Sequence, residues 1–519
     1  MAPYFGLTGR KLHAAVWIIS WVAVSMFGYN GAAAGGVLNS PAFQKQFPSI
    51  DVETAPPGQA QHRSTIQGTV VATFTLLGTV GALGCIWVGD ILGRRKTLFL
   101  ACSINLIGAI LIGTAYSLAQ FVVARVFLGI GVGGIISTIP AWQSELSRAE
   151  SRGSHVSSFG IYCGTGLSLA LWLAYGLSFT TGEVTWRLPV AGGGVLAVIV
   201  MTFIFFLPES PRWLKLKDRH EEARRVLEAL HPGDPDTINK EIEDIELALK
   251  LSVKQASLKY MFTMGPQRVF HRVMLACIVQ IMLQFTGVNA IAYYTPTIYA
   301  NNLHFPAVEA GALAAASQAM IILGGIICSF TVDRFGRRLL MLVSAAGMSI
   351  CLAIVTGLTS NGSPAASKAA VVFLYLYYIV YTLGFIGIPF LYASEIAPVQ
   401  LRAPICGLST GISWVFNFLV VEITPVGFTT IGYRYFIIYA VFCASFVPIV
   451  YFFYPETAGR SLEEIDAIFV EATSIWDVVS VAKKMPKHHL AEHKFDQKIV
   501  EQLPVEDKEP KLSHGEESP

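Results

Sequence analysis

The sequence predicts an all-α membrane protein in which twelve transmembrane helices form two six-helix bundles. Of the 519 residues, 53% are hydrophobic and only 14% are charged, and the mean hydropathy is +0.54. This composition leaves too few polar residues for a water-soluble surface. The chain also repeats a charged turn, because Asp90-Ile91-Leu92-Gly93-Arg94-Arg95 recurs as Asp333-Arg334-Phe335-Gly336-Arg337-Arg338. Each copy follows a long apolar stretch, which indicates two related halves.

About twelve apolar runs reach the length of about 20 residues that a helix needs to cross roughly 30 Å of hydrocarbon. We expect the spans near residues 14–38, 64–89, 97–117, 120–144, 154–180, 187–207, 270–300, 310–332, 339–360, 370–394, 404–426 and 433–454.

A polar, highly charged segment separates the first six runs from the last six, and its amphipathic patterning predicts short linker helices. The polar tail after the last run ends in a stretch rich in Glu, Lys and Pro. The predicted organisation is an N-terminal tail, a first bundle, a linker, a second bundle and a C-terminal tail, at 1–13, 14–207, 208–269, 270–454 and 455–519.

The distribution of charge predicts the orientation. Basic residues collect in alternate connections between the spans, which is typical of cytoplasmic loops. Both termini and the linker are therefore expected in the cytoplasm. A net charge of +2, with scattered basic residues, does not indicate a nucleic-acid partner. No nucleophile-and-base set, metal-ligand cluster or phosphate loop is present to suggest an enzyme, a cofactor or a metal.

Carboxylates and arginines recur at the expected cytoplasmic ends of the spans. Charge pairs there would bias a two-state motion if they form when the cytoplasmic side closes and separate when it opens. The alternative is that the basic residues only anchor the orientation. The candidate gate residues are Asp90, Arg94, Arg95, Glu145, Arg152, Glu209, Arg212, Asp333, Arg334, Arg337, Arg338, Glu395, Arg402 and Glu456.

Several motifs in a fixed order carry a family resemblance over residues 14–466. They are Arg125 with Gly129, Gly131, Pro140, Glu145, Arg152 and Gly153; Pro208-Glu209-Ser210-Pro211-Arg212-Trp213; Gln280, Gln284, Gly287, Asn289, Tyr293 and Tyr294; and Pro455-Glu456-Thr457 with Gly459. In these motifs the chain resembles the sugar porter family of the major facilitator superfamily. The residues of the motifs are most similar to those of fungal members. The resemblance implies the twelve-helix major facilitator fold and monosaccharide transport by alternating access.

The seventh run carries amides that suit a neutral sugar. Gln280 and Gln284 are four residues apart and share a helical face, and an amide offers the donors and the acceptor that hydroxyl groups need. Asn289 is about half a turn away and reaches the same cavity only if the helix distorts, for which Gly287 and Pro296 are suited. The alternative is that these amides only hold helices together.

Two further runs contribute candidate substrate contacts. The eleventh contains Ser413, Trp414 and Asn417, and the Trp face can stack on a sugar ring. In the tenth, Gly384, Gly387 and Pro389 weaken the helix before Phe390, which stands where similar proteins often carry Trp. The alternative for both aromatic residues is packing against lipid or other helices.

Asn30 departs from the pattern of proton-coupled sugar porters, which resemble one another in having Asp at this position. A carboxylate there can take up and release a proton beside the arginine matched by Arg125, whereas an amide cannot titrate. Passive uniport is the direct interpretation. Symport remains an alternative, because Glu422 is the one carboxylate expected inside a span, where ionisable groups are functional by default.

We therefore expect a facilitative carrier for a hexose or pentose in the plasma membrane, with the bilayer and a small sugar as its partners. A proton-coupled symporter and a non-transporting sugar receptor remain the alternatives. The sequence leaves the sugar and the oligomeric state open.

Overall fold

The computed structural model describes residues 3–52, 54–56, 58–146, 158–252, 258–398, 401–460 and 462–485, and in these ranges the chain is helical without β-strands. Eleven helical stretches are long and apolar enough to cross a membrane. The last of them, Pro404–Phe453, is divided by a single 3-10 turn at Gly432–Arg434, so the described chain provides twelve spans. The predicted fold class is confirmed.

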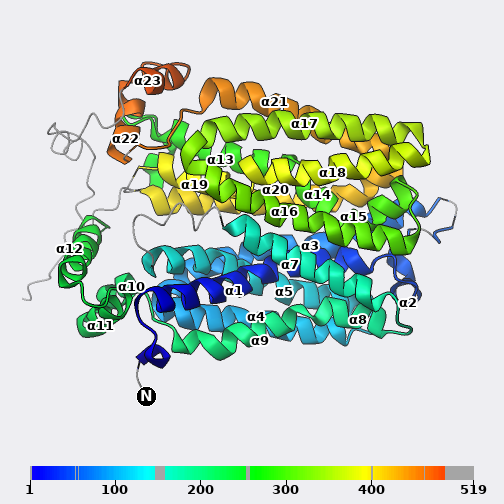
Figure 1. Ribbon diagram of the computed structural model, residues 1–519, viewed down its shortest axis with the longest axis horizontal. Coiled ribbons are helices and arrows are strands. Elements are labelled where there is room, and N and C mark those ends of the chain that lie inside the picture. The colour runs from blue at the N-terminus through cyan, green and yellow to red at the C-terminus, as the bar shows by residue number, and fades with distance from the viewer. Residues whose placement is uncertain are drawn as a thin grey trace, which may run out of the picture.

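The spans form two bundles that lie one above the other in Figure 1. The first bundle contains α1 (Gly9–Val37), α3 (Ala60–Leu92), α4 (Arg94–Gly113), α5 (Leu118–Leu146), α7 (Phe159–Leu177), and α8 (Val184–Ala191) with α9 (Gly193–Phe203). The second contains α13 (Val269–Phe285), α14 (Val288–Tyr293), α15 (Thr295–Thr297), α16 (Ala307–Phe335), α17 (Arg337–Asn361), α18 (Pro364–Gly384), α19 (Ile388–Ile396), α20 (Arg402–Ile431) and α21 (Tyr435–Phe453).

The seventh span is broken in the middle. Gly287 separates α13 from α14 with a φ of +84°, a left-handed conformation that a residue with a side chain rarely adopts. A side chain at this position would also collide with the Tyr439 ring, which lies 2.6 Å from the place of a Cβ atom. The helix distortion expected at Gly287 is therefore present.

The two bundles touch along α3 with α20 and along α7 with α16. Small residues allow the backbones to approach, as in other membrane helix pairs. A Cβ atom at Gly68 of α3 would lie 2.3 Å from the backbone oxygen of Glu422 on α20. The broken seventh span makes a further contact, because the Tyr293 ring of α14 packs on Gly31 of α1.

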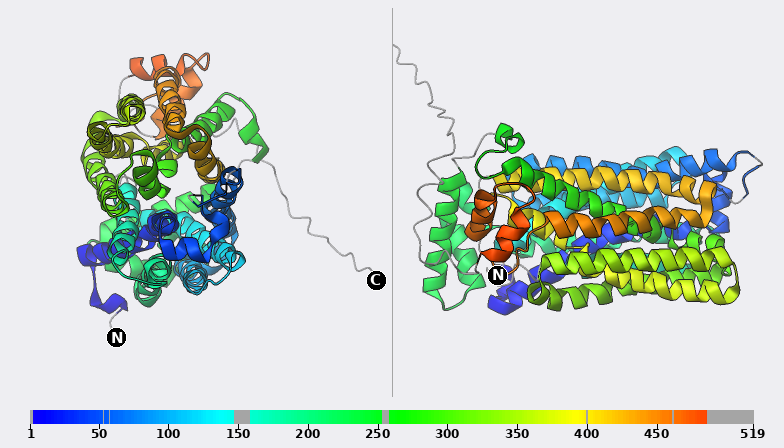
Figure 2. Two further views of the ribbon diagram at one scale, coloured as in Figure 1. Left: turned by 90° about the vertical axis from the view of Figure 1, so that its right-hand side faces the viewer. Right: turned by 90° about the horizontal axis from the view of Figure 1, so that it is seen from above.

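The linker and tail helices gather at one end of the molecule, with the first described residues of the chain (Figures 1 and 2). Linker helix α11 packs on α1, and α22 packs on the end of α19. An ion pair of 2.7 Å between Lys215 and Glu246 holds α10 to α12. The linker and tail helices are α10 (Pro211–Leu216), α11 (His220–Leu230), α12 (Pro235–Ser252), α22 (Leu462–Glu471) and α23 (Val478–Lys484); α2 (Pro41–Gln46) lies at the other end.

Candidate functional site

A network of uncharged polar side chains lies beside the break in the seventh span. The Gln284 amide on α13 donates a hydrogen bond of 2.8 Å to the Ser413 hydroxyl on α20. Asn289 on α14 donates a hydrogen bond of 2.9 Å to the side-chain oxygen of Gln284. The left-handed turn at Gly287 therefore brings Asn289 back to the face that carries Gln284.

Two nearby amides are buried without satisfying all their hydrogen-bonding groups. Gln280 lies one turn before Gln284 and is fully buried, and neither its side-chain oxygen nor its nitrogen has a partner among the described atoms. The side-chain oxygen of Asn417, one turn after Ser413, also has none. Leaving a buried amide unpaired costs about 1–3 kcal/mol per group, so these atoms are candidates for hydrogen bonds with a polar ligand.

Four aromatic side chains from the two bundles form a row of contacting rings. The Trp414 ring of α20 contacts Phe27 of α1, with ring centroids 5.6 Å apart. Phe27 leads to Phe159 of α7 at 6.5 Å, and Phe159 contacts Phe390 of α19 at 5.9 Å. Trp414 and Phe390 therefore reach the first bundle through Phe27 and Phe159, which the sequence analysis missed. No motif distinguishes these two phenylalanines from the many that face lipid.

Arg125 is a fully buried cation inside the first bundle. It donates hydrogen bonds of 2.9 Å to the backbone oxygen of Asn30 and of 2.6 Å to that of Val71, and its guanidinium lies 4.8 Å from the Phe74 ring centroid. Within the described ranges no carboxylate forms an ion pair with it. The Asn30 side chain is buried and has no partner there for either polar atom. Asn30 and Arg125 thus meet through the backbone.

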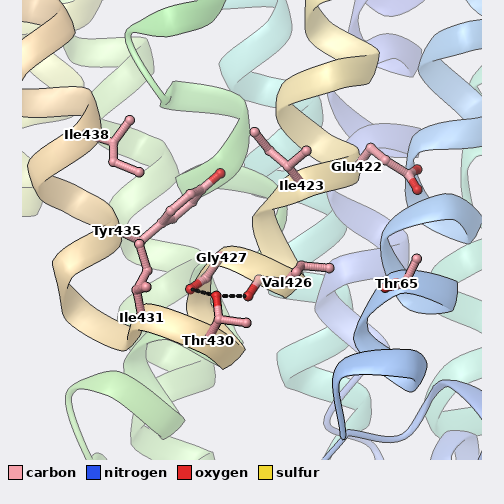
Figure 3. A pocket seen from close by; sticks show the side chains of 9 residues that line it. All are labelled: Thr65, Glu422, Ile423, Val426, Gly427, Thr430, Ile431, Tyr435 and Ile438. Atoms are coloured by element: carbon pink, nitrogen blue, oxygen red, sulfur yellow. Dashed lines mark hydrogen bonds between the residues drawn. The ribbon is translucent and has the colours of Figure 1, made fainter. Parts of the chain in front are cut away.

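Glu422 lies at the contact between the bundles, toward the end opposite the linker. One of its carboxylate oxygens accepts a hydrogen bond of 2.7 Å from Thr69 on α3, and the other is buried without a partner among the described atoms. It also borders a groove of about 360 Å³. In Figure 3 its carboxylate points away from α20 toward the helix that carries Thr65, and Tyr435 lies on the other side of the groove. This carboxylate therefore joins the two halves directly.

The repeated charged turn forms a compact cluster in the first bundle. The Arg94 side chain pairs with Glu145 at 3.0 Å. The Glu209 carboxylate accepts backbone hydrogen bonds from Arg94 at 2.9 Å and from Arg95 at 3.1 Å. Because these are the first N–H groups of α4, Glu209 closes the N-terminus of that helix and complements its dipole.

The second bundle repeats this cluster with nearly the same geometry. Arg337 pairs with Glu395 at 3.0 Å, and Glu456 accepts backbone hydrogen bonds from Arg337 at 2.9 Å and Arg338 at 3.1 Å. In both copies a glycine precedes the helix, with φ of +84° at Gly93 and +88° at Gly336. The charged turn that is repeated in the sequence therefore forms equivalent hydrogen bonds in the two bundles.

Burial raises the pKa of Glu209 above its ordinary value, and backbone N–H donors together with the Arg95 charge act against this effect. Desolvation disfavours the charged carboxylate, whereas hydrogen bonds from N–H groups favour it. The N-terminus of α4 thus provides hydrogen bonds that favour the charged form of the Glu209 carboxylate although it is largely buried.

The other gate residues lie around the two clusters. Asp90 pairs with Arg94 at 3.5 Å and Asp333 with Arg337 at 3.0 Å, and both carboxylates are exposed. Arg212 and Arg334 are exposed, Arg402 is half-buried, and Arg152 lies outside the described residues. Within the described part of the chain, the ion pairs of this set each join elements of one bundle.

Comparison with known proteins decides the family, because the model of the family described as "Sugar (and other) transporter" matches residues 16–469. The chain belongs to this sugar transporter family. The sugar transporter STL1 of Saccharomyces cerevisiae is 32% identical over 504 residues, covering 94% of this chain and 88% of that protein. A probable quinate permease of Aspergillus clavatus is 30% identical and covers 92% and 90%. The expectation of a multi-pass membrane transporter, and not an enzyme, is confirmed.

Solved structures share the fold of this transporter. The partially occluded, inward-open xylose transporter XylE from E. coli aligns with a TM-score of 0.73 at 19% identity, over 87% of this chain and all of that chain. The proton:xylose symporter XylE bound to 6-bromo-6-deoxy-D-glucose aligns with a TM-score of 0.73 at 20% identity. At this identity the likeness concerns the fold alone.

Two carboxylates pair with the same arginine but differ in burial, so substituting each of them shows how burial affects the contribution of an ion pair to the free energy of unfolding. Glu395 and Asp333 both lie 3.0 Å from Arg337, but their side chains are 17% and 65% exposed. We expect Glu395→Gln to lower the free energy of unfolding by about 2 kcal/mol, because it leaves a buried cation poorly paired, and Asp333→Asn by about 0.5 kcal/mol or less. Denaturant unfolding in mixed micelles measures both, and equal losses would contradict this explanation.

Proposed function

We propose that this transporter carries a neutral monosaccharide, a hexose or pentose, by facilitated diffusion through alternating access. The observation that carries the proposal is the set of uncharged amides beside the broken seventh span, several of whose buried polar atoms lack protein partners. A ring of hydroxyl groups both donates and accepts hydrogen bonds, as an amide does. The proposed substrate-binding residues are Gln280, Gln284, Asn289, Phe390, Trp414 and Asn417.

The proposed recognition is polar on one side and aromatic on the other. Gln284 already binds Ser413 and Asn289, so these three side chains hold each other in place before a substrate arrives. Trp414 and Phe390 lie at the ends of the aromatic row between the bundles, where a ring face can pack on the apolar face of a sugar. A hexose transporter of Saccharomyces cerevisiae, HXT13, is 27% identical to this chain, which supports the proposed substrate class.

The two charged clusters support the motion that we propose. Each cluster joins helices of one bundle only, so it stiffens that bundle while leaving the contact between bundles free to change. Rocking of two rigid halves about a central site is a common form of alternating access. In this proposal Arg94 and Arg337, with their carboxylates, preserve the shape of the halves at the cytoplasmic gate.

The position of basic residues supports a cytoplasmic location for the linker and both termini. Helices α4 and α17 begin at the end of the molecule where the linker and tail helices lie. Their first residues are basic: Arg94 and Arg95 in α4, and Arg337 and Arg338 in α17. The relatives of this chain include fungal sugar transporters, and uptake from outside requires a carrier at the cell surface. We therefore place the protein in the plasma membrane.

Proton symport is the second candidate, and one observation favours it. Glu422 is a carboxylate within a span, and one of its oxygens is buried without a described partner. Ionisable groups in such positions often carry protons through transporters. Against this, the coupling position next to Arg125 holds Asn30, which cannot titrate, so we keep uniport as the main proposal.

Replacing Gln284 and Asn289 together with alanine should strongly reduce the uptake of labelled glucose and xylose in transporter-deficient cells. Loss of two or more hydrogen bonds of about 1 kcal/mol each predicts at least a tenfold decrease in kcat/KM. The matched control is Gln46→Ala, which removes a half-buried amide that binds the backbone of Tyr116 at the other end of the molecule, and this variant should transport normally. Undiminished uptake by a well-expressed double variant would disprove the proposed site.

The coupling mode is tested by a protonophore and by one isosteric substitution. For a uniporter, we expect initial sugar uptake to change less than about twofold with the protonophore and in Glu422→Gln, because the amide oxygen can still accept the Thr69 hydrogen bond. Thr69→Val, which removes that hydrogen bond and leaves the carboxylate, separates its structural role from proton transfer. Abolition of uptake by the protonophore and by Glu422→Gln, with Thr69→Val active, would establish symport instead.

A further inference from the structure

The tail of the chain forms a fixed platform against the last span. In α23, Val478, Val479 and Ala482 are buried. The Arg460 guanidinium donates hydrogen bonds of 2.6 and 2.8 Å to the backbone oxygens of Ala482 and Met485, which closes the C-terminus of α23. The helix is therefore held in one place and not merely tethered.

Aromatic side chains are exposed on this platform and on the adjoining end of the last span. Tyr451 and Phe452 near the end of α21 are 49% and 52% exposed, and Trp476 just before α23 is 62% exposed. The Trp476 ring packs on Phe453 with centroids 4.6 Å apart, so it continues the apolar surface of the last span. Exposed aromatic residues at the end of a transmembrane helix are typical of the membrane–water interface.

Two cations lie near one of these aromatic rings. The Arg338 guanidinium is 5.1 Å and the Lys483 ammonium 5.7 Å from the centroid of the Tyr451 ring. Lys484 follows in the last turn of α23 and is exposed. Within the described chain neither lysine forms an ion pair. The nearby Asp477 carboxylate accepts hydrogen bonds from Thr473 and Ser474.

The platform lies at the end of the last span, where we expect the surface of the bilayer. Viewed along the long axis, α22 and α23 project beyond the outline of the two bundles, next to the end of α21 (Figure 2, left). A helix placed beside a membrane-spanning bundle, at the end of its last span, faces lipid headgroups. Lysine side chains in such positions extend their ammonium groups toward headgroup phosphates.

We propose that Tyr451, Phe452, Trp476, Lys483 and Lys484 form a binding site for an anionic phospholipid of the leaflet on the side of the linker helices. The lysines bind the headgroup, and the aromatic rings lie at the boundary between headgroup and acyl chain. The site requires only that the chain spans a membrane and does not depend on the substrate or the coupling mode.

Native mass spectrometry of the purified full-length protein, titrated with phosphatidylserine or phosphatidylcholine of equal acyl chains, tests the site. We expect the wild-type protein to prefer phosphatidylserine and K483Q/K484Q to bind it at least about fivefold more weakly, because each basic residue near an anionic surface contributes about that factor. Phosphatidylcholine binding should not change. The matched control K45Q/K368Q removes two exposed lysines elsewhere on the chain and should retain the preference.

Three results would overturn the proposal. They are equal binding of both lipids by the wild-type protein, an equal loss of preference in the control pair, and displacement of the lipid by millimolar inorganic phosphate, which would indicate a free-anion site. Trp476→Ala should weaken both lipids alike, since it removes apolar contact and no charge. Sugar uptake measured on the same variants is a separate readout, so failure of this site and failure of the transport proposal are distinguishable.

Discussion

A carboxylate that closes the N-terminus of a helix in each half is the interaction on which the structure depends. Glu209 follows the sixth span and Glu456 follows the twelfth. Their carboxylates accept hydrogen bonds from the first N–H groups of α4 and α17. A side chain at Gly93 or Gly336 would occupy the space of these carboxylates, at 2.8 and 2.4 Å from a carboxylate oxygen. The last span of each bundle is thereby tied to its third, which supports our proposal that each bundle moves as one body.

The contact between the bundles has a different character. It consists mainly of small residues and rings packed on backbone, as at Gly68 against Glu422 and Gly31 against Tyr293. Among the described residues few side-chain hydrogen bonds cross it, and those from Thr69 to Glu422 and from Thr297 to Asn39 lie toward the end opposite the linker. Strong polar interactions within each half and weak ones between halves are the conditions for a two-state rocking motion. The broken seventh span lies between the bundles and carries the amides that we assign to the substrate.

The sequence predicted those features whose physical cause is local. The lengths of the apolar runs predicted the spans. Gly287 and Pro296 predicted a distortion of the seventh span, and this distortion brings Asn289 to Gln284. The sequence could not show that Glu209 binds the backbone N–H groups of Arg94 and Arg95 while Arg212 remains exposed, because a backbone donor leaves no mark in the pattern of residue types. Nor could it show that Phe27 and Phe159 connect Trp414 with Phe390, since these contacts join four separate spans.

The central claim is that two rigid halves tilt about the amide site, and distances along one pair of helices test it most directly. Spin labels at Thr65 and Thr430 report the separation of α3 and α20 at one end, and labels at Ile91 and Leu408 report it at the other; all four side chains are exposed. Pulsed electron paramagnetic resonance with and without a transported sugar should show the two distances changing in opposite directions. Two distances that stay constant, or that change in the same direction, would contradict the account.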